Sequence, residues 1–195
     1  MDALLQFDRD LFVHLNSDWT MPVLDWLMPI LTDLHKNTIA VGVVLPIVIA
    51  AWIWTSRARA VKVIISLLVA ASAADLISYR VLKAVAQRPR PEISAVETHM
   101  PVHMRVESAS GTSFPSNHAA NTTAEATVLW LALRRWSWIA ILYAALIAYS
   151  RVYVGVHYPL DVIGGAAVGA ACGWATWRGL RNWIARPGFA RPRGP

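Results

Sequence analysis

The sequence predicts an all-α fold, a polytopic helix bundle with about five membrane-crossing helices. Three observations lead to this class. Hydrophobic residues make up 56% of the 195 positions, the mean hydropathy is +0.42, and long apolar runs alternate with short basic segments. The ten tryptophans, several of them near the ends of apolar runs, fit the aromatic belts of a bilayer protein. The length fits one domain, so we expect residues 1–195 to form a single integral membrane unit.

Residues 1–36 are expected to lie at the membrane interface without crossing it. Residues 3–16 place four apolar side chains at helical spacing, with acids on the other face: Leu4, Phe7, Leu11 and Leu15. This pattern is typical of an interfacial helix. The next apolar run, 21–34, is interrupted by prolines and aspartates and is well short of the roughly 20 residues that a crossing needs. We expect a second interfacial helix there, with a sixth crossing as the alternative.

Five apolar runs are expected to cross the membrane. They are residues 38–55, 63–82, 115–133, 136–149 and 160–177. A polar segment, 84–113, separates the second run from the third and is too long for a simple turn, and a basic tail, 179–195, follows the fifth. Lysines and arginines cluster after the first and third runs and in the tail. This asymmetry predicts that the C-terminus is cytoplasmic and that the 84–113 segment lies outside.

The charge and cysteine patterns exclude some classes of partner. The formal net charge is +6, but the arginines form short clusters beside apolar segments and no continuous basic face, so we expect no nucleic-acid partner. Cys172 is the only cysteine, which excludes an internal disulfide and a thiolate metal site. In the fifth run, Gly165, Gly169 and Gly173 have a spacing that allows close helix contact. We favour packing of these glycines against another helix of the same chain over a dimer interface, and the oligomeric state is left open.

The unusual polar residues are predicted to meet at one face of the membrane. Because successive crossings alternate in direction, the end of the second, the start of the third, the end of the fourth and the start of the fifth share the outer face. Three cations gather there, Lys83, Arg90 and Arg151, and would repel one another unless an anion lay between them. Phosphate suits this place, because guanidinium groups match its oxygens in pairs and lysine adds a compact charge. Arg88 is expected to contact the same phosphate or a lipid headgroup.

Two helix starts add further donors to this face. Pro115 and Pro159 both suit the first turn of a helix. The backbone N–H groups of Ser116, Asn117 and His118 are then expected to be free to face the anion.

Two histidines supply the chemistry that phosphate transfer needs. His157 precedes Asp161 by four residues, and a carboxylate on one ring nitrogen would leave the other free to attack phosphorus. His118 remains to protonate the leaving oxygen. Asp75 shares a helix face with Lys83 and either tunes that lysine or bonds to another helix, the second being the preferred interpretation.

These residues resemble the type-2 phosphatidic acid phosphatase superfamily, whose signature has three parts: Lys-x6-Arg-Pro, Pro-Ser-Gly-His and Ser-Arg-x5-His-x3-Asp. The first part corresponds to Lys83 through Arg90-Pro91, and the third to Ser150-Arg151, His157 and Asp161, both with full spacing. The middle part reads Pro115-Ser116-Asn117-His118, with Asn117 in place of glycine. A backbone N–H survives that change, whereas a glycine-only conformation would be lost.

The resemblance implies a lipid phosphatase that needs no metal and no cofactor. His157 would form a phosphohistidine, Asp161 would orient it, and His118 would act as acid and then as base. The residues implied to hold the phosphate, to which Arg88 and Asn117 are added as neighbours, are Lys83, Arg90, Ser116 and Arg151. Ser150 belongs to the motif without a defined role.

The sequence thus predicts release of a phosphate from a membrane lipid at the outer face of the bilayer. The candidate substrates are undecaprenyl diphosphate, phosphatidylglycerol phosphate, phosphatidic acid and the 1-phosphate of lipid A. One alternative is a lipid-phosphate binding or transport protein without turnover. The other is an enzyme that acts on a soluble phosphate ester or transfers the phosphate to another lipid. The complete set of His157, Asp161 and His118 argues against a pure binder, because binding needs the cations but no nucleophile.

Overall fold

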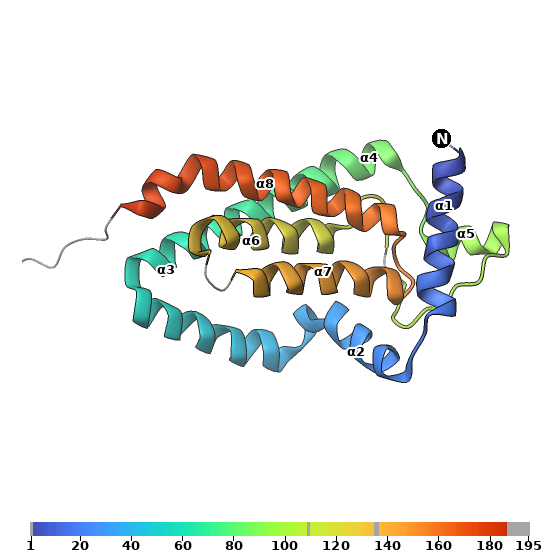
Figure 1. The fold of residues 1–195 in the computed structure, drawn as a ribbon, viewed down its shortest axis with the longest axis horizontal. Helices are drawn as coiled ribbons and strands as arrows, with labels where there is room; N and C mark the ends of the chain where they lie inside the picture. The colour runs from blue at the N-terminus through green and yellow to red at the C-terminus, as the bar shows by residue number, and fades with distance from the viewer. Residues whose placement is uncertain (1, 109, 135–136, 187–195) are drawn as a thin grey trace, which may run out of the picture.

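The N-terminal segment forms two helices, as predicted. The computed structural model describes residues 2–108, 110–134 and 137–186, and this part of the chain is helical without strands (Figure 1). α1 (Asp2–Val13) is extended by a π-helical turn (His14–Asp18), and α2 (Pro22–Thr32) begins with its proline in the first turn. A 3₁₀ turn (Leu34–Lys36) follows α2. The placement of both helices relative to a membrane stays a prediction.

α3 (Leu45–Leu76) contains most of the first two predicted crossings in one bent helix. It follows a π-helical turn (Ala40–Val44) and leads through another (Ile77–Leu82) into α4 (Lys83–Ala86). Arg57, in the basic stretch between the two crossings, has non-helical backbone angles (φ 46°, ψ −126°). Figure 1 shows that the chain turns back within α3, so its two halves run in opposite directions, as two successive crossings require.

The other helices match the later predicted runs with shifted ends. A short helix, α5 (Pro91–Thr98), lies inside the polar segment 84–113, where no helix was predicted. α6 (Asn117–Leu133), α7 (Trp138–Tyr153) and α8 (Pro159–Ala185) follow. α7 ends beyond residue 149 and α8 well beyond residue 177, so the first part of the expected tail is helical. Residues 187–195 of the tail lie outside the described part.

The number of membrane crossings stays a prediction. Within the described residues, one helical run, Ala40–Thr98, is long and apolar enough to cross a membrane by length and composition. α2 and α7 are apolar but shorter. α6 and α8 carry many small and polar residues, which lowers their hydropathy and lets them pack closely against each other.

The three regularly spaced glycines of α8 pack against another helix of the same chain. This confirms the preferred interpretation, packing within the chain. A methyl group added at Gly165, Gly169 or Gly173 would collide with backbone carbonyl oxygens of α6. Buried small side chains continue this contact onto α3, and with Val128 they form one core: Ala70, Ala74, Ala120, Ala124 and Cys172. Close backbone approach of α3, α6 and α8 fixes the ends of these helices relative to one another.

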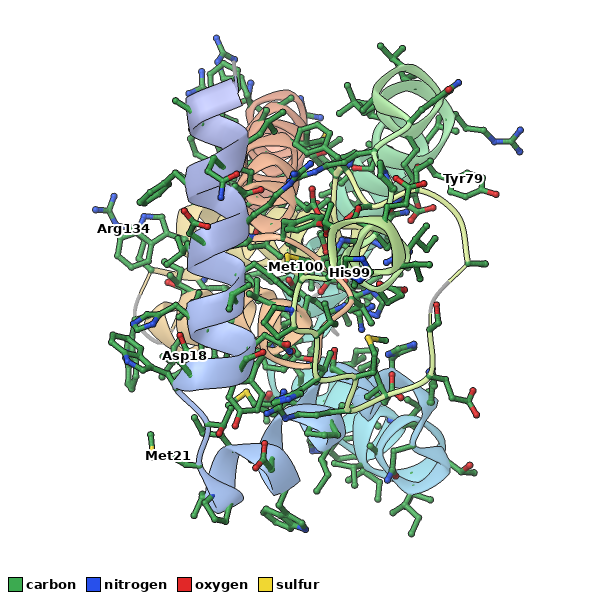
Figure 2. All side chains as sticks on the ribbon, turned by 90° about the vertical axis from the view of Figure 1, so that its right-hand side faces the viewer. Asp18, Met21, Tyr79, His99, Met100 and Arg134 are labelled. Carbon is green, nitrogen blue, oxygen red and sulfur yellow. The ribbon has the colours of Figure 1, made fainter. Side chains whose placement is uncertain are left out.

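The N-terminal helix, α1, lies across the end of the bundle that is opposite the bend of α3. Figure 1 shows α1 running across the ends of α7 and α8, and Figure 2 looks onto this end, with His99 and Met100 of the polar segment at its centre. Asp8 and Phe12 on the inner face of α1 are buried, whereas Leu4 and Phe7 are exposed. The first half of the predicted apolar face therefore points away from the bundle, whereas Leu15 at its end packs against the core around Phe12, and the inner face carries a buried acid.

Candidate active site

His157 and Asp161 form the centre of the site at the end that α1 covers. His157 lies in the loop between α7 and α8, and Asp161 lies in the first turn of α8. The ring Nδ1 of His157 is 3.5 Å from Oδ2 of Asp161, and both side chains are almost fully buried (3% and 0% exposed). Burial, with the charges of Arg151 and Arg90, lowers the pKa of His157 to about 4, although Asp161 opposes that shift. The imidazole is therefore neutral near pH 7, as a nucleophile must be.

The carboxylate of Asp161 is fixed by several donors besides the histidine. Oδ2 accepts hydrogen bonds from the Ser113 hydroxyl and from the Tyr158 backbone N–H, the latter at 2.8 Å. Oδ1 accepts one from Nη1 of Arg88, also at 2.8 Å. With these donors in place, the carboxylate cannot rotate freely, so it presents one oxygen to His157. The 3.5 Å separation is long for a hydrogen bond, and catalytic contacts of this kind often shorten only when substrate binds.

Arg88 links Asp161 to Asp8 of α1. Its Nη2 donates to Oδ2 of Asp8 at 2.5 Å, and its guanidinium group lies over the Tyr158 ring at 4.0 Å. Oδ1 of Asp8 accepts the backbone N–H of Leu160 at 2.8 Å. Arg88 therefore bridges two buried carboxylates, and both of its terminal nitrogens bond to carboxylates in place of the predicted phosphate or headgroup.

Arg90 and Lys83 lie on the other side of the histidine. Nη1 of Arg90 is 3.4 Å from Nε2 of His157 and donates to the Val156 carbonyl at 2.8 Å. Its Nε and Nη2 donate to the carbonyls of Gly111 and Ser110, at 3.0 and 3.1 Å. Nζ of Lys83 donates to the next carbonyl, Thr112, at 2.6 Å. In this structure, three successive carbonyl oxygens of the loop occupy the donors that were predicted to hold phosphate.

Arg151 and Ser150 come from the end of α7. Nη1 of Arg151 donates to the Thr32 hydroxyl of α2 at 2.7 Å. The Arg151 side chain is buried, and within the described residues its Nε has no hydrogen-bond partner. The buried Ser150 hydroxyl donates to the Ile147 carbonyl in its own helix at 2.8 Å, so it stabilises α7.

The helix start at Ser116 departs from one prediction. Its backbone N–H donates to the Asp161 carbonyl at 3.0 Å, so this group is not free to face an anion. The reason is the close packing of α6 on α8, which brings the two helix starts together. The Ser116 hydroxyl is buried and, among the described residues, has no hydrogen-bond partner.

Asn117 and His118 point in different directions from the same turn. The Asn117 amide donates to Asp75 of α3 at 2.8 Å, which confirms the inter-helix interpretation for Asp75. The His118 ring packs edge-on against His35, with 4.9 Å between centroids. His118 is also within electrostatic reach of Arg151 and His157. Of the two, only His118 faces the histidine and arginine group.

Sequence reasoning missed several residues that position this site. Asp8, Ser113 and Thr32 contact Arg88, Asp161 and Arg151 respectively, and each is buried. Ser113 adjoins the third predicted crossing, but nothing in its local pattern indicates the contact. For Asp8, the available signal was its i, i+4, i+8 spacing with Phe12 and Asn16, three residues that share one helix face.

The polar segment is tied down by a second network. Asn16 donates to the carbonyls of Tyr153 and His103, at 2.8 and 3.0 Å, and accepts the His103 N–H at 2.8 Å. Arg105 pairs with Asp25 of α2 at 2.6 Å. These contacts hold the segment across the end of the bundle, above the buried site.

The fold and this site define a class of protein: an α-helical bundle that holds a buried His–Asp pair among arginines and a lysine. A family model described as the PAP2 superfamily matches residues 59–185, and the chain belongs to this superfamily. This confirms the resemblance read from the three motifs.

Named relatives and one solved structure agree with this assignment. The undecaprenyl-diphosphatase of Sulfolobus acidocaldarius is 51% identical over 59 residues, 30% of this chain and 29% of that protein. The putative undecaprenyl-diphosphatase YbjG of Escherichia coli is 29% identical over 86% of this chain and 85% of its own length. The PAP2-type transmembrane phosphatidylglycerolphosphate phosphatase of Bacillus subtilis is similar in structure, with a TM-score of 0.65 and 25% identity. That similarity covers 95% of this chain and 90% of the solved one.

Proposed function

We propose that this protein hydrolyses a terminal phosphate from a membrane lipid through a phosphohistidine intermediate. The observation that carries the proposal is the position of His157, a buried neutral imidazole with Asp161 beside Nδ1 and Arg90 beside Nε2. The carboxylate favours the tautomer with the proton on Nδ1, which leaves the lone pair of Nε2 facing the cations. A pure binding protein has no use for a nucleophile in that place.

The reaction has two steps. Nε2 of His157 attacks phosphorus, the bond from phosphorus to the lipid oxygen breaks, and His118 gives its proton to that oxygen. His118 then takes a proton from water, the water oxygen attacks phosphorus, and the bond to His157 breaks to release phosphate. The charge that develops on the phosphoryl oxygens is stabilised by fixed cations, which need little rearrangement during the reaction.

The phosphate is held by the side chains of Arg90, Lys83 and Arg151, by the unpartnered Ser116 hydroxyl and by the backbone N–H of Asn117 in the first turn of α6. To bind, it takes over the hydrogen bonds that Arg90 and Lys83 now donate to the 110–112 carbonyls. Arg88 does not contact the phosphate and instead holds the carboxylate of Asp161 in place. Ser150 does not contact the phosphate either, because its hydroxyl is bonded within α7. No metal is assigned a role in either step.

The substrate we propose is a lipid with an isoprenoid or acyl tail and a phosphate or diphosphate head. An isoprenoid diphosphate such as undecaprenyl diphosphate is favoured, because the relative with this name in Escherichia coli aligns along most of both chains. Phosphatidylglycerol phosphate, phosphatidic acid and lipid A 1-phosphate have the same reacting group.

We further propose that the whole chain is one domain in a bacterial-type inner membrane, crossing it several times. In this arrangement the site and the 84–113 segment face outward, residues 1–36 lie in the interface, and the 179–195 tail lies in the cytoplasm. The support is the charge asymmetry of the sequence, with the site at the end of the bundle opposite the arginine-rich turns. A headgroup can then reach the site while its tail remains in hydrocarbon.

The test is release of inorganic phosphate by the purified protein from a panel of lipid phosphates and diphosphates, with a chelator present. Wild-type protein should release phosphate, and His157→Ala should reduce the rate at least about a thousandfold, because the covalent route is lost. Intact-protein mass after rapid acid-free quenching should show one added phosphoryl group on the wild type and none on the variant. Turnover by a folded His157→Ala protein would refute the nucleophile, and transfer of the label to a second lipid instead of water would identify a phosphotransferase.

A further inference from the structure

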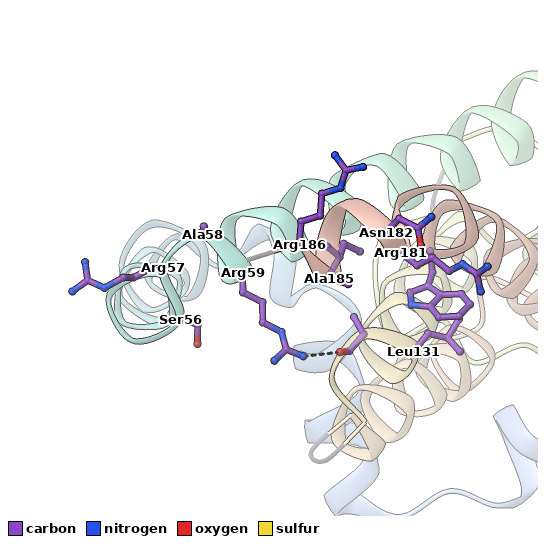
Figure 3. A pocket seen from close by; sticks show the side chains of 12 residues that line it. Ser56, Arg57, Ala58, Arg59, Leu131, Arg181, Asn182, Ala185 and Arg186 are labelled. Atoms are coloured by element: carbon purple, nitrogen blue, oxygen red, sulfur yellow. Dashed lines mark hydrogen bonds between the residues drawn. The ribbon is translucent and has the colours of Figure 1, made fainter. Parts of the chain in front are cut away.

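A cavity lined by arginines lies at the opposite end of the bundle from His157. It has a volume of about 750 Å³ and lies between the bend of α3 and the C-terminal ends of α6 and α8 (Figure 3). Arginines line it from two of these elements, at Arg57, Arg59, Arg181 and Arg186, together with Asn182 and Trp177. Figure 3 shows the Arg57 side chain pointing away from the cavity. The other three arginines leave its wall in different directions, with the Arg181 guanidinium over the Trp177 ring at 5.8 Å, so a ligand must draw these long side chains together.

These arginines have no acidic residue near them in sequence to balance their charge. Residues 38–74, 126–160 and 162–195, which include every segment lining the cavity, contain no aspartate or glutamate. Within the described residues, the side chains of Arg181 and Arg186 make no hydrogen bond or ion pair with the protein. Arg59 donates from Nη2 to the Ala132 carbonyl at 3.1 Å, which leaves its other nitrogens available. Lys62 donates to the Trp183 and Arg186 carbonyls, at 2.9 and 2.8 Å, and so satisfies the end of α8.

An apolar groove begins where the basic cavity ends. It has a volume of about 530 Å³, runs between α6, α7 and α8, and shares Leu131 with the cavity. Small side chains such as Ala126, Ala145 and Ala170 leave the space open, and Trp130 and Trp174 flank it, 43% and 56% exposed. From Leu131 to Thr123 the groove follows α6 for about 12 Å, at a rise of about 1.5 Å per residue.

We propose that this end of the protein binds an anionic phospholipid, at a site separate from the catalytic one. The lipid phosphate pairs with Arg59, Arg181 and Arg186, and one acyl chain lies in the groove between Trp130 and Trp174. A cationic cavity that continues into an apolar groove is complementary to an amphiphile with a negative head, and basic pockets between membrane helices bind such headgroups. A free phosphate ion would use the arginines but would leave the groove unused.

The experiment measures lipid binding to the purified full-length protein in detergent by native mass spectrometry. Phosphatidylglycerol is compared with phosphatidylcholine carrying the same acyl chains. Phosphatidylglycerol has no terminal phosphate, so the proposed catalytic reaction does not consume it. The wild type should bind phosphatidylglycerol more tightly than phosphatidylcholine. Arg181→Gln with Arg186→Gln should weaken phosphatidylglycerol binding about 25-fold, since each basic residue beside an anionic headgroup contributes roughly fivefold.

Matched variants separate this site from general surface charge. Arg178→Gln removes one positive charge from the same helix without lining the cavity, and it should change binding less than twofold. Arg181→Gln alone also removes one charge and should weaken binding about fivefold. Ala170→Phe fills the groove and should weaken lipid binding, whereas glycerol phosphate should not compete with the lipid. Equal binding of both lipids, an Arg178→Gln effect as large as that of Arg181→Gln, or full competition by glycerol phosphate would overturn the proposal. The Arg181 and Arg186 variants should still release phosphate from the substrate, so the two proposals fail independently.

Discussion

Replacement of Asp8 by asparagine tests whether α1 positions Asp161, the carboxylate that we propose orients the nucleophile. Asp8 is 1% exposed, and both of its oxygens accept hydrogen bonds, from Arg88 Nη2 at 2.5 Å and from the Leu160 N–H at 2.8 Å. Asparagine keeps one acceptor and places an NH₂ group against a second donor. Hydrogen bonds to charged groups contribute about 1.5–3 kcal/mol, and loss of a buried partner costs about 3–5 kcal/mol.

We expect a value near the lower figure, about 2 kcal/mol, because Arg88 keeps its bond to Asp161. Displacement of Asp161 would convert part of this lost free energy into a higher activation barrier. If half of it is converted, kcat falls about fivefold, and if all of it is converted, kcat falls about 30-fold. KM for the lipid phosphate should change little, because Asp8 does not touch the proposed phosphate site. The assay is phosphate release over a range of lipid concentrations, with thermal unfolding measured on the same samples.

The control is Asp10→Asn on the same helix. Asp10 is exposed, and its carboxylate accepts a hydrogen bond from Gln6, also exposed. That variant should match the wild type in kcat within about twofold, since exposed interactions of this kind contribute little. A kcat for Asp8→Asn equal to that of Asp10→Asn would refute the idea that α1 acts through Arg88.

Two further predictions concern the nucleophile and the helix packing. The pKa of His157 is lowered to about 4, so its ring should stay neutral well below pH 6.5, and NMR of histidine-labelled protein should show protonation of the His157 ring only as pH drops toward 4. Protonation near pH 6.5, the ordinary value for histidine, would contradict the buried environment. Gly169→Ala should lower the unfolding temperature by several degrees, because the added methyl group collides with the Ala120 carbonyl. Gly179→Ala meets nothing within 4 Å and should not; equal losses for the two variants, measured by thermal unfolding in detergent, would count against the α6–α8 contact.

Much of the fold was readable from the sequence because apolar runs, prolines and basic turns act locally. The bend at Arg57 falls in the basic stretch between the first two predicted crossings, and α8 begins at Pro159 as predicted. Pro115 was expected in the first turn of α6, but that helix begins two residues later at Asn117, with Ser116 as its N-cap. The boundaries were less accurate, since α8 continues into the expected tail and α5 forms in the polar 84–113 segment, for which no helix was predicted. Composition alone gives no sharp signal for where a helix in such surroundings stops.

The sequence by itself determined the superfamily of this protein, through three motifs whose spacing identifies it and which contain a histidine, an aspartate and several cations. Only the tertiary structure decided what each side chain contacts. In the tertiary structure Arg88 bonds to Asp161 and Asp8, the Ser116 N–H joins α6 to α8, and α1 lies against the site. The physical reason is that buried donors and acceptors must find partners wherever packing places them. Those partners come from residues far apart in the chain, whose distances no local spacing encodes.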